Sequence, residues 1–240
     1  MTVDQENASD ARVAQQRATL PALLAGWAET LGDQRAFTFL DYPGYAGEPN
    51  GVSTSWSWRE LDARVSTVAA MLAGRLSPGE RVAVLASQAP ECLVGFLGAL
   101  RAGVIAVPLF TPSLPGHTGR LRTVLADCRP ALALTTRADQ PAVTEFLGPY
   151  LAVVAVEDIP AAVPRDWPEL DPHSVAYLRY NSGPARARAA VRVTHASLVA
   201  SAARQRIDAS DLVDGGLATV SWLPLFHDLG LVLSIQGELS

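Results

Sequence analysis

The sequence predicts an α/β fold built on doubly wound parallel sheets. Arg81–Ser87, which reads RVAVLAS, is a continuous apolar run, and similar runs occupy Val104–Val107 and Ala131–Thr135. Such runs are typical of strands that are covered on both faces. Segments with apolar residues at helical spacing separate the runs, and this alternation argues for a parallel sheet. We therefore expect three neighbouring parallel strands with helices on both faces.

The segments before these strands predict a helix, a hairpin and a second helix. Apolar residues recur at helical spacing over Leu20–Leu31, and Ala36–Leu40 and Val52–Trp56 are short strand patterns on either side of a turn-rich loop. Ser57 and Glu60 have the spacing of a capping box, so the second helix is expected to begin directly after Ser57.

The same alternation continues after the first parallel strand. Pro90 suits the first turn of a helix that extends to Ala102. Further helices are expected at Leu121–Leu125 and at about Ala142–Leu147, and a further strand at Leu151–Val156. Together these elements complete a second repeat of strand and helix.

Proline residues indicate where the chain divides. Four of them lie within Ile159–Pro172, which is the best candidate for a domain boundary. Residues 1–18 are then a polar leader, residues 19–158 a first α/β subdomain, and residues 173–240 the start of a second α/β subdomain. The second sheet would be incomplete at its C-terminal end.

Composition narrows the classes of function. The 240 residues carry a net charge of −5, and all 19 basic residues are arginines. Without a lysine the chain offers no Schiff-base chemistry and no phosphate-binding lysine. Cys92 and Cys128 lie in apolar or helical surroundings without a neighbouring ligand at metal-binding spacing, so they indicate buried small residues and no metal site.

The chain shows no targeting or membrane segment. The first twenty residues are polar and acidic, unlike a secretory signal. The longest apolar stretch, Cys92–Phe110, is interrupted by Arg101 and is therefore a poor membrane span. We expect a cytoplasmic protein.

Positive charge is concentrated in one window of the sequence. Between Pro172 and Ile207 there are six arginines and no acidic residue, so this window carries +6 and the remainder 13 − 24 = −11. Such a reversal points to an anionic ligand. A nucleic acid is not favoured as that ligand, because no aromatic residue lies between Arg186 and Arg206 to stack on bases.

A candidate anion-binding loop lies inside this window. Tyr177–His195 reads YLRYNSGPARARAAVRVTH, which predicts a strand, a turn of small residues and a second strand. A turn that contains Gly183 can aim successive N–H groups at one point, where Ser182 and Arg186 would add donors. The alternative is an exposed hairpin turn with solvated arginines. After the second strand, Thr194 is a plausible N-cap for a helix to about Ile207.

This stretch resembles the phosphate-binding signature of the adenylate-forming synthetases, whose usual form is YTSGSTGxPKGVxxSH. Matching positions are Tyr180, Ser182, Gly183, Val191 and His195. The sequence is similar above all to the fatty-acyl-AMP ligase branch, whose form YTSGSTRxPAGVxxSH also matches at two more positions, Arg186 and Ala189.

The loop also departs from that signature. Asn181, Pro184 and Ala185 stand where the family has Thr, Ser and Thr. Asn181 keeps a polar side chain, but Pro184 and Ala185 remove two hydroxyl donors, and Pro184 also removes one N–H. The resemblance implies that Asn181, Ser182, Gly183 and Arg186 bind the nucleotide.

A second motif follows an expected buried strand at Ala218–Leu223. Ser221–Val232 reads SWLPLFHDLGLV and resembles the ligase motif SWLPxYHDMGL. In an open α/β sheet, residues at the carboxyl end of a strand face the ligand crevice. The resemblance implies that His227 is catalytic and that His227 and Asp228 contact the substrate. The alternative is that Asp228 only complements a helix N-terminus and His227 is merely packed.

The resemblance implies a fold and an activity. The fold is that of the N-terminal domain of an adenylate-forming enzyme. The activity is activation of a fatty acid with ATP and Mg²⁺ to an acyl-adenylate, followed by transfer to the thiol of an acyl carrier protein or coenzyme A. The family's magnesium-binding Glu, ribose-binding Asp and catalytic Lys have no counterpart here.

Two classes of function therefore stay open. The chain is either an N-terminal part of a ligase, which a partner chain could complete, or a non-catalytic module that keeps the fold and binds an acyl group or an anion.

Overall fold

The computed structural model describes residues 18–42, 51–162, 165–180, 190–210 and 220–226, together with Gly230, and side chains only up to residue 203 within 190–210. Its centre is a six-stranded sheet with the order β6-β5-β3-β4-β7-β8. The strands are β3 (Arg81–Leu85), β4 (Ile105–Leu109), β5 (Leu132–Thr135), β6 (Val153–Ala155), β7 (Val175–Arg179) and β8 (Val191–Thr194). β3 pairs in parallel with both β4 and β5, so the expected neighbours are confirmed.

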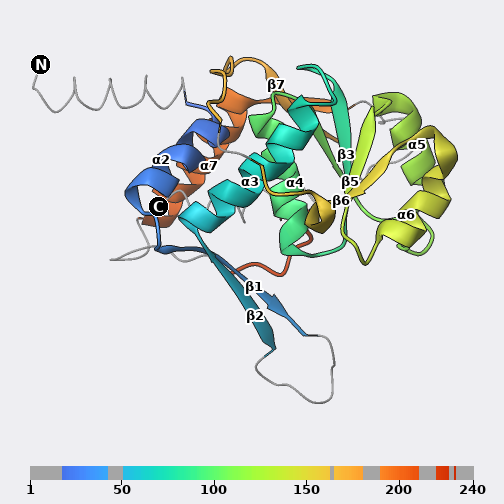
Figure 1. The fold of residues 1–240 in the computed structure, drawn as a ribbon, viewed down its shortest axis with the longest axis horizontal. Coiled ribbons are helices and arrows are strands. Elements are labelled where there is room, and N and C mark those ends of the chain that lie inside the picture. Colours follow the sequence, from blue (N-terminus) through green and yellow to red (C-terminus); the bar gives the residue numbers. More distant parts are fainter. Residues whose placement is uncertain are drawn as a thin grey trace, which may run out of the picture.

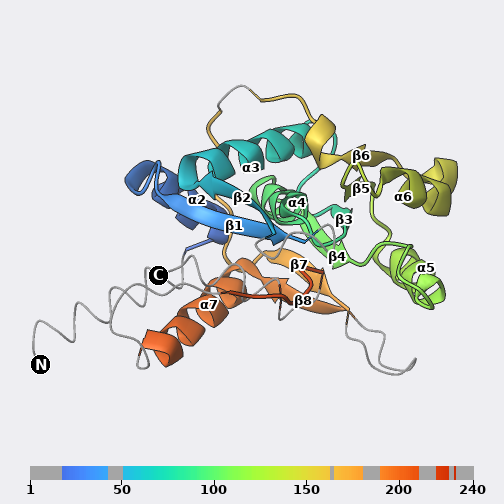
Figure 2. The same cartoon turned by 90° about the horizontal axis from the view of Figure 1, so that it is seen from below.

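Helices cover both faces of this sheet (Figures 1 and 2). Val82 and Val84 of β3 belong to a core shared with α2 (Leu20–Thr30), α3 (Trp58–Ala73) and α4 (Pro90–Arg101). Ala83 and Leu85 belong to a second core with α5 (Thr118–Cys128) and α6 (Gln140–Leu147). Because successive strand residues point to opposite faces, both sets are apolar, and this explains the continuous apolar run.

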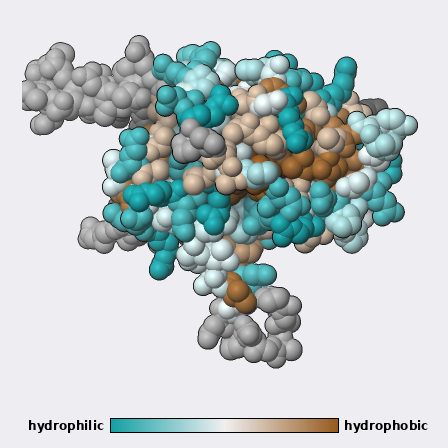
Figure 3. Space-filling view, viewed as in Figure 1, coloured by the Kyte–Doolittle hydropathy of each residue, from teal (hydrophilic) through white to brown (hydrophobic). Residues whose placement is uncertain are grey.

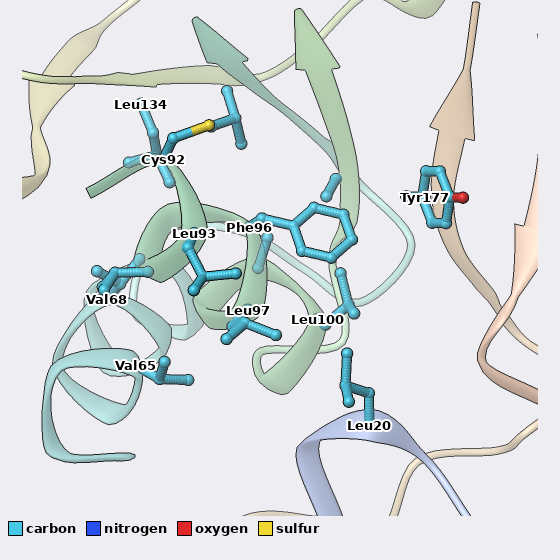
Figure 4. Packing of buried hydrophobic residues seen from close by; sticks show 14 of the residues in the cluster. Leu20, Val65, Val68, Cys92, Leu93, Phe96, Leu97, Leu100, Leu134 and Tyr177 are labelled. Carbon is cyan, nitrogen blue, oxygen red and sulfur yellow. The ribbon is translucent and has the colours of Figure 1, made fainter. Parts of the chain in front are cut away.

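The larger core is centred on α4 (Figure 4). The ring of Phe96 meets the ring of Tyr177 edge to face, with 5.5 Å between centroids. Gly98 permits close packing of α4 on α3, because a Cβ built there would lie 2.6 Å from the Cβ of Val68. Arg101 is also buried, and its guanidinium donates to Asp62 Oδ1 at 2.5 Å.

An N-terminal hairpin projects from this body (Figure 1). It consists of β1 (Arg35–Asp41) and β2 (Val52–Ser57), which are antiparallel. The predicted capping box at its end is confirmed, since Glu60 N donates to Ser57 Oγ at 3.2 Å and Ser57 N to Glu60 Oε2 at 2.8 Å. Figure 3 shows apolar surface on the hairpin, whose exposed large apolar side chains include Leu40 and Val52.

The elements from β6 onwards bear on the expected domain boundary. Short 3₁₀ turns at Gly148–Tyr150 and Val156–Asp158 flank β6. β7 pairs in parallel with β4, so one sheet continues across the expected boundary at Ile159–Pro172, and the division into subdomains stays a prediction. β7 pairs antiparallel with β8, which leads into α7 (His195–Ser210).

The expected buried strand at Ala218–Leu223 is wrong for the part that is described. Residues 220–223 form no strand, and the side chains of Val220 and Trp222 are 85% and 86% exposed. A strand requires a neighbour for its backbone N–H and C=O groups, and no described strand lies beside this segment. Among the described helices, none is long and apolar enough to cross a membrane.

Candidate functional site

The candidate site residues themselves lie outside the described residues. This applies to Asn181, Ser182, Gly183 and Arg186 of the loop and to the pair His227 and Asp228. The structure does describe the residues on both sides of the loop and the segment that leads into His227.

The loop is carried by an antiparallel hairpin, as its sequence predicts. Arg179 at the end of β7 pairs with Val191 at the start of β8, and Leu178 pairs with Arg192. Both ends of the intervening segment are therefore held by one ladder. Since β7 runs parallel to β4, the loop leaves the sheet at the carboxyl edge of its parallel strands. This is the edge where open α/β sheets bind ligands.

Tyr180 anchors the beginning of the loop to α5. Its hydroxyl donates to Asp127 Oδ2 at 2.6 Å, and its carbonyl oxygen accepts from Arg120 Nη2 at 3.4 Å. Partial burial raises the pKa of Tyr180, and the hydrogen bond to Asp127 raises it further. The phenol is therefore protonated at neutral pH and acts as a fixed donor.

Gln88 holds the segment that precedes the second motif. Leu225 N donates to Gln88 Oε1 at 2.9 Å, and Gln88 Nε2 donates to Leu223 O at 3.2 Å. Gln88 follows β3 directly, so this contact also lies at the carboxyl edge of the sheet. Segments that are distant in the sequence thus meet beside the loop hairpin.

Phe110, just after β4, connects the two motifs. Its ring contacts the ring of Phe226 at 6.1 Å between centroids, and the guanidinium of Arg120 lies 5.8 Å from its centre. Tyr180 and Phe226 both pack against the apolar cluster that contains Phe110. The residue before the loop and the residue before His227 therefore share one apolar support.

The helix after the hairpin begins as expected. Ser197 N donates to Thr194 Oγ1 at 3.1 Å, which confirms Thr194 as the N-cap. His195 N and Ala196 N donate to the carbonyl oxygens of Ser174 and Pro172 at 3.2 and 2.8 Å. These N–H groups are already bonded within the chain, so this end of α7 does not offer them to a phosphate.

His195 is a buried neutral base. It is 2% exposed, and its Nδ1 has no hydrogen-bond partner among the residues that the structure describes. Burial lowers the pKa of His195 to about 4, although the charge of Asp171 opposes that change. The imidazole is therefore uncharged at neutral pH and supports the hairpin by packing.

Sequence reasoning missed Gln88, Phe110, Arg120 and the Tyr180 hydroxyl as parts of this site. A signal for the first two was present, because both stand just after predicted parallel strands, where ligand-facing residues are found. Nothing local to Arg120 indicated its contact with Tyr180, 60 residues away.

The described residues also bear on a metal ion. They contain no group of three or more His, Cys, Asp or Glu side chains placed to hold one.

Comparison with known proteins gives the family. The model of the AMP-binding enzyme family matches residues 24–239. The chain is 40% identical over 221 residues to the long-chain-fatty-acid–AMP ligase FadD32 of Mycolicibacterium smegmatis, covering 89% of this chain and 34% of that protein. It is 39% identical over 231 residues to the long-chain-fatty-acid–AMP ligase FadD26 of Mycobacterium marinum, covering 92% and 39%.

Solved structures agree in fold. A fatty acyl-adenylate ligase from L. pneumophila, in complex with acyl adenylate and pyrophosphate, superposes with a TM-score of 0.75 at 24% identity, covering 91% of this chain and 38% of that one. A structure from a study of fatty acyl-adenylate ligases from E. coli and L. pneumophila gives 0.73 at 29% identity, with coverage of 92% and 39%. The chain thus spans well under half the length of these relatives. The family match covers nearly the whole chain, and on this ground the chain belongs to the AMP-binding enzyme family.

Proposed function

We propose that this chain provides the nucleotide- and acyl-binding part of a fatty-acyl-AMP ligase. Such a ligase joins a fatty acid to AMP at the expense of ATP. The family match and the two long-chain-fatty-acid–AMP ligase relatives support the substrate class. The acceptor, a carrier-protein or coenzyme A thiol, belongs to the same proposal, as does a cytoplasmic location.

One observation carries the proposal. The loop hairpin and the segment before His227 come together at the carboxyl edge of the parallel strands, where Phe110 supports both. An acyl-adenylate requires such proximity, because its phosphate and its acyl carbonyl are joined by a single oxygen. A site for it must hold an anion and a carboxylate-derived group side by side.

The proposed roles follow the chemistry of adenylation. An oxygen of the fatty-acid carboxylate attacks the α-phosphorus of ATP, and the bond from that phosphorus to the bridging oxygen of pyrophosphate breaks. N–H groups around Ser182 and Gly183, the Asn181 side chain and Arg186 would hold the phosphate charge. His227 and Asp228 would lie beside the carboxylate as it approaches, which places the reacting groups.

The test measures binding of a non-hydrolysable acyl-adenylate, an acyl sulfamoyl adenosine with a long acyl chain. Binding is chosen because the chain has no lysine and turnover in this family requires one. Calorimetry should show saturable binding by the 240-residue chain. Arg186→Ala should weaken it about ten- to a hundredfold, the loss of a charged hydrogen bond. Arg188→Ala, two residues away, is the matched control and should bind like the parent chain.

The alternative is a non-catalytic module that binds an acyl group or an anion. It is favoured by Pro184 and Ala185, which replace two hydroxyl donors of the family signature. Such a module would bind a free fatty acid as tightly as the acyl-adenylate analogue and would be insensitive to Arg186→Ala. Absence of any binding of the analogue by the parent chain contradicts the ligase proposal.

A further inference from the structure

We infer that Gln88 is a positioning residue for the second motif. Its side-chain amide fixes the backbone of Leu223–Leu225 and so sets the point from which the chain enters His227. The inference rests on the proposed function, since it concerns how the acyl-adenylate site is assembled. It adds a residue that lies 139 positions before that histidine, in the turn between β3 and α4.

No described strand lies beside Leu223–Leu225, and the amide of Gln88 makes the hydrogen bonds that such a strand would make. In a sheet, a neighbouring strand offers an acceptor to one N–H and a donor to a nearby C=O. Gln88 supplies both from one side chain: Oε1 accepts from Leu225 N at 2.9 Å, and Nε2 donates to Leu223 O at 3.2 Å. Two bonds from one planar group fix the orientation of the segment as well as its distance.

Gln88 is itself placed by its neighbours. The preceding residue, Ser87, donates to Asp139 through its main-chain N and its hydroxyl, each at 2.8 Å. Asp139 also accepts from Thr136 Oγ1 at 2.9 Å, at the end of β5. On the other side, the buried Pro90 begins α4. Gln88 and Ala89 lie between these two fixed points, so the backbone of Gln88 is restrained and its amide is held ready for the segment.

Gly230, later in the motif, packs against the backbone of Leu223 and Pro224. Gly230 is buried, and a Cβ built on it would lie 2.8 Å from Leu223 O and still closer to Pro224 O. The chain therefore returns to the Leu223 carbonyl that Gln88 holds and to the adjacent carbonyl of Pro224, and only glycine permits this approach. Phe226 is fixed on Phe110. Phe226 and Gly230, the described residues on either side of residues 227–229, are thus both positioned, and Gln88 determines where the first of them lies.

The experiment compares Gln88→Ala and Gln88→Glu with Gln34→Ala as control. Gln34 is an exposed glutamine held through its main chain, so truncating it removes an amide without touching the segment. Glutamate keeps the acceptor for Leu225 and loses the donor to Leu223. Three quantities are measured: hydrogen exchange of the Leu225 amide, the ¹⁹F resonance of 5-fluorotryptophan at the exposed Trp222, assigned with Trp222→Phe, and affinity for the acyl sulfamoyl adenosine.

We expect the Leu225 amide to be protected in the parent chain and in Gln88→Glu, and to lose protection in Gln88→Ala. The Trp222 resonance should shift in Gln88→Ala alone. Affinity for the analogue should fall about tenfold in Gln88→Ala, as expected for two net hydrogen bonds, and by less in Gln88→Glu. The urea midpoint of unfolding should stay that of Gln34→Ala, which separates local positioning from general destabilisation.

Three results would overturn the inference, and they are distinguishable. If the parent chain binds the analogue and Gln88→Ala binds it equally well, Gln88 does not position the site although the proposed function stands. If the parent chain does not bind the analogue, the proposed function fails, and the positioning role fails with it. An unprotected Leu225 amide in the parent chain removes the hydrogen bonds on which the inference depends.

Discussion

The buried imidazole of His195 should make the stability of the fold depend on pH. Its pKa is lowered from 6.5 to about 4 by burial. Between these values the unfolded chain binds a proton that the folded chain does not, so stability rises with pH. The stabilisation is complete above pH 6.5 and is lost as pH falls towards 4. At about 1.4 kcal/mol for each pH unit, the loss amounts to about 3 kcal/mol.

The perturbation is His195→Leu, which keeps a similar volume and removes the titrating group. Urea unfolding is measured at several pH values between 7 and 4 for the parent chain and the variant. Carboxylates titrate in both proteins, so the difference between the two curves isolates His195. This difference should change by about 3 kcal/mol across the interval.

The exposed His173 is the matched control, because His173→Leu removes an imidazole that water already solvates. Its curve shows what the loss of an exposed imidazole does by itself, and the change seen in His195→Leu is compared with it. The reasoning is refuted if the profile of His195→Leu is parallel to the parent, or if NMR shows that His195 titrates near 6.5.

Three further changes test the packing and the loop. Gly98→Ala should destabilise the fold by about 1–3 kcal/mol in urea unfolding, because the new methyl group enters the interface with α3. Gly26→Ala is the control and should not destabilise it, because nothing lies within 4 Å of a Cβ built at Gly26. Equal effects of the two variants would refute the packing argument. Asp62→Ala should lower the free energy of unfolding by about 3 kcal/mol, since it leaves a buried guanidinium without its carboxylate, and an unchanged value would show that the pair contributes nothing. Restoring hydroxyls with Pro184→Ser and Ala185→Thr together should tighten ATP binding in calorimetry about tenfold or more, and unchanged affinity would mean that the loop does not bind phosphate.

The sequence predicted the elements that depend on neighbouring residues. The apolar runs at β3, β4 and β5 identified parallel strands because burial on both faces confines polar residues to the strand ends, as at Arg81 and Thr135. Ser57 and Glu60 identified the start of α3 because a capping box is satisfied within four residues. In each case the physical cause lies inside a short window of the chain.

The contacts around the candidate site depend on residues that are far apart. The amide of Gln88 meets Leu223 across 135 positions, and the hydroxyl of Tyr180 meets Asp127 across 53. No periodicity records such a pairing. The strand expected up to Leu223 failed for a similar reason, because apolar residues favour a strand only where a partner strand stands beside them. The loop residues and His227 stay predictions.

Because the β7–β8 ladder closes the loop, the fold does not depend on the residues that would bind a ligand within the loop. The ladder from Val175 to Thr194 closes the ends of the loop whatever residues stand between them. Doubling the length of a flexible loop changes its closure free energy by only about 0.6 kcal/mol. Residues such as Pro184 and Ala185 can therefore replace hydroxyl donors without weakening the sheet. A scaffold of this kind can lose or change its ligand while its architecture persists, so fold and ligand must be tested independently.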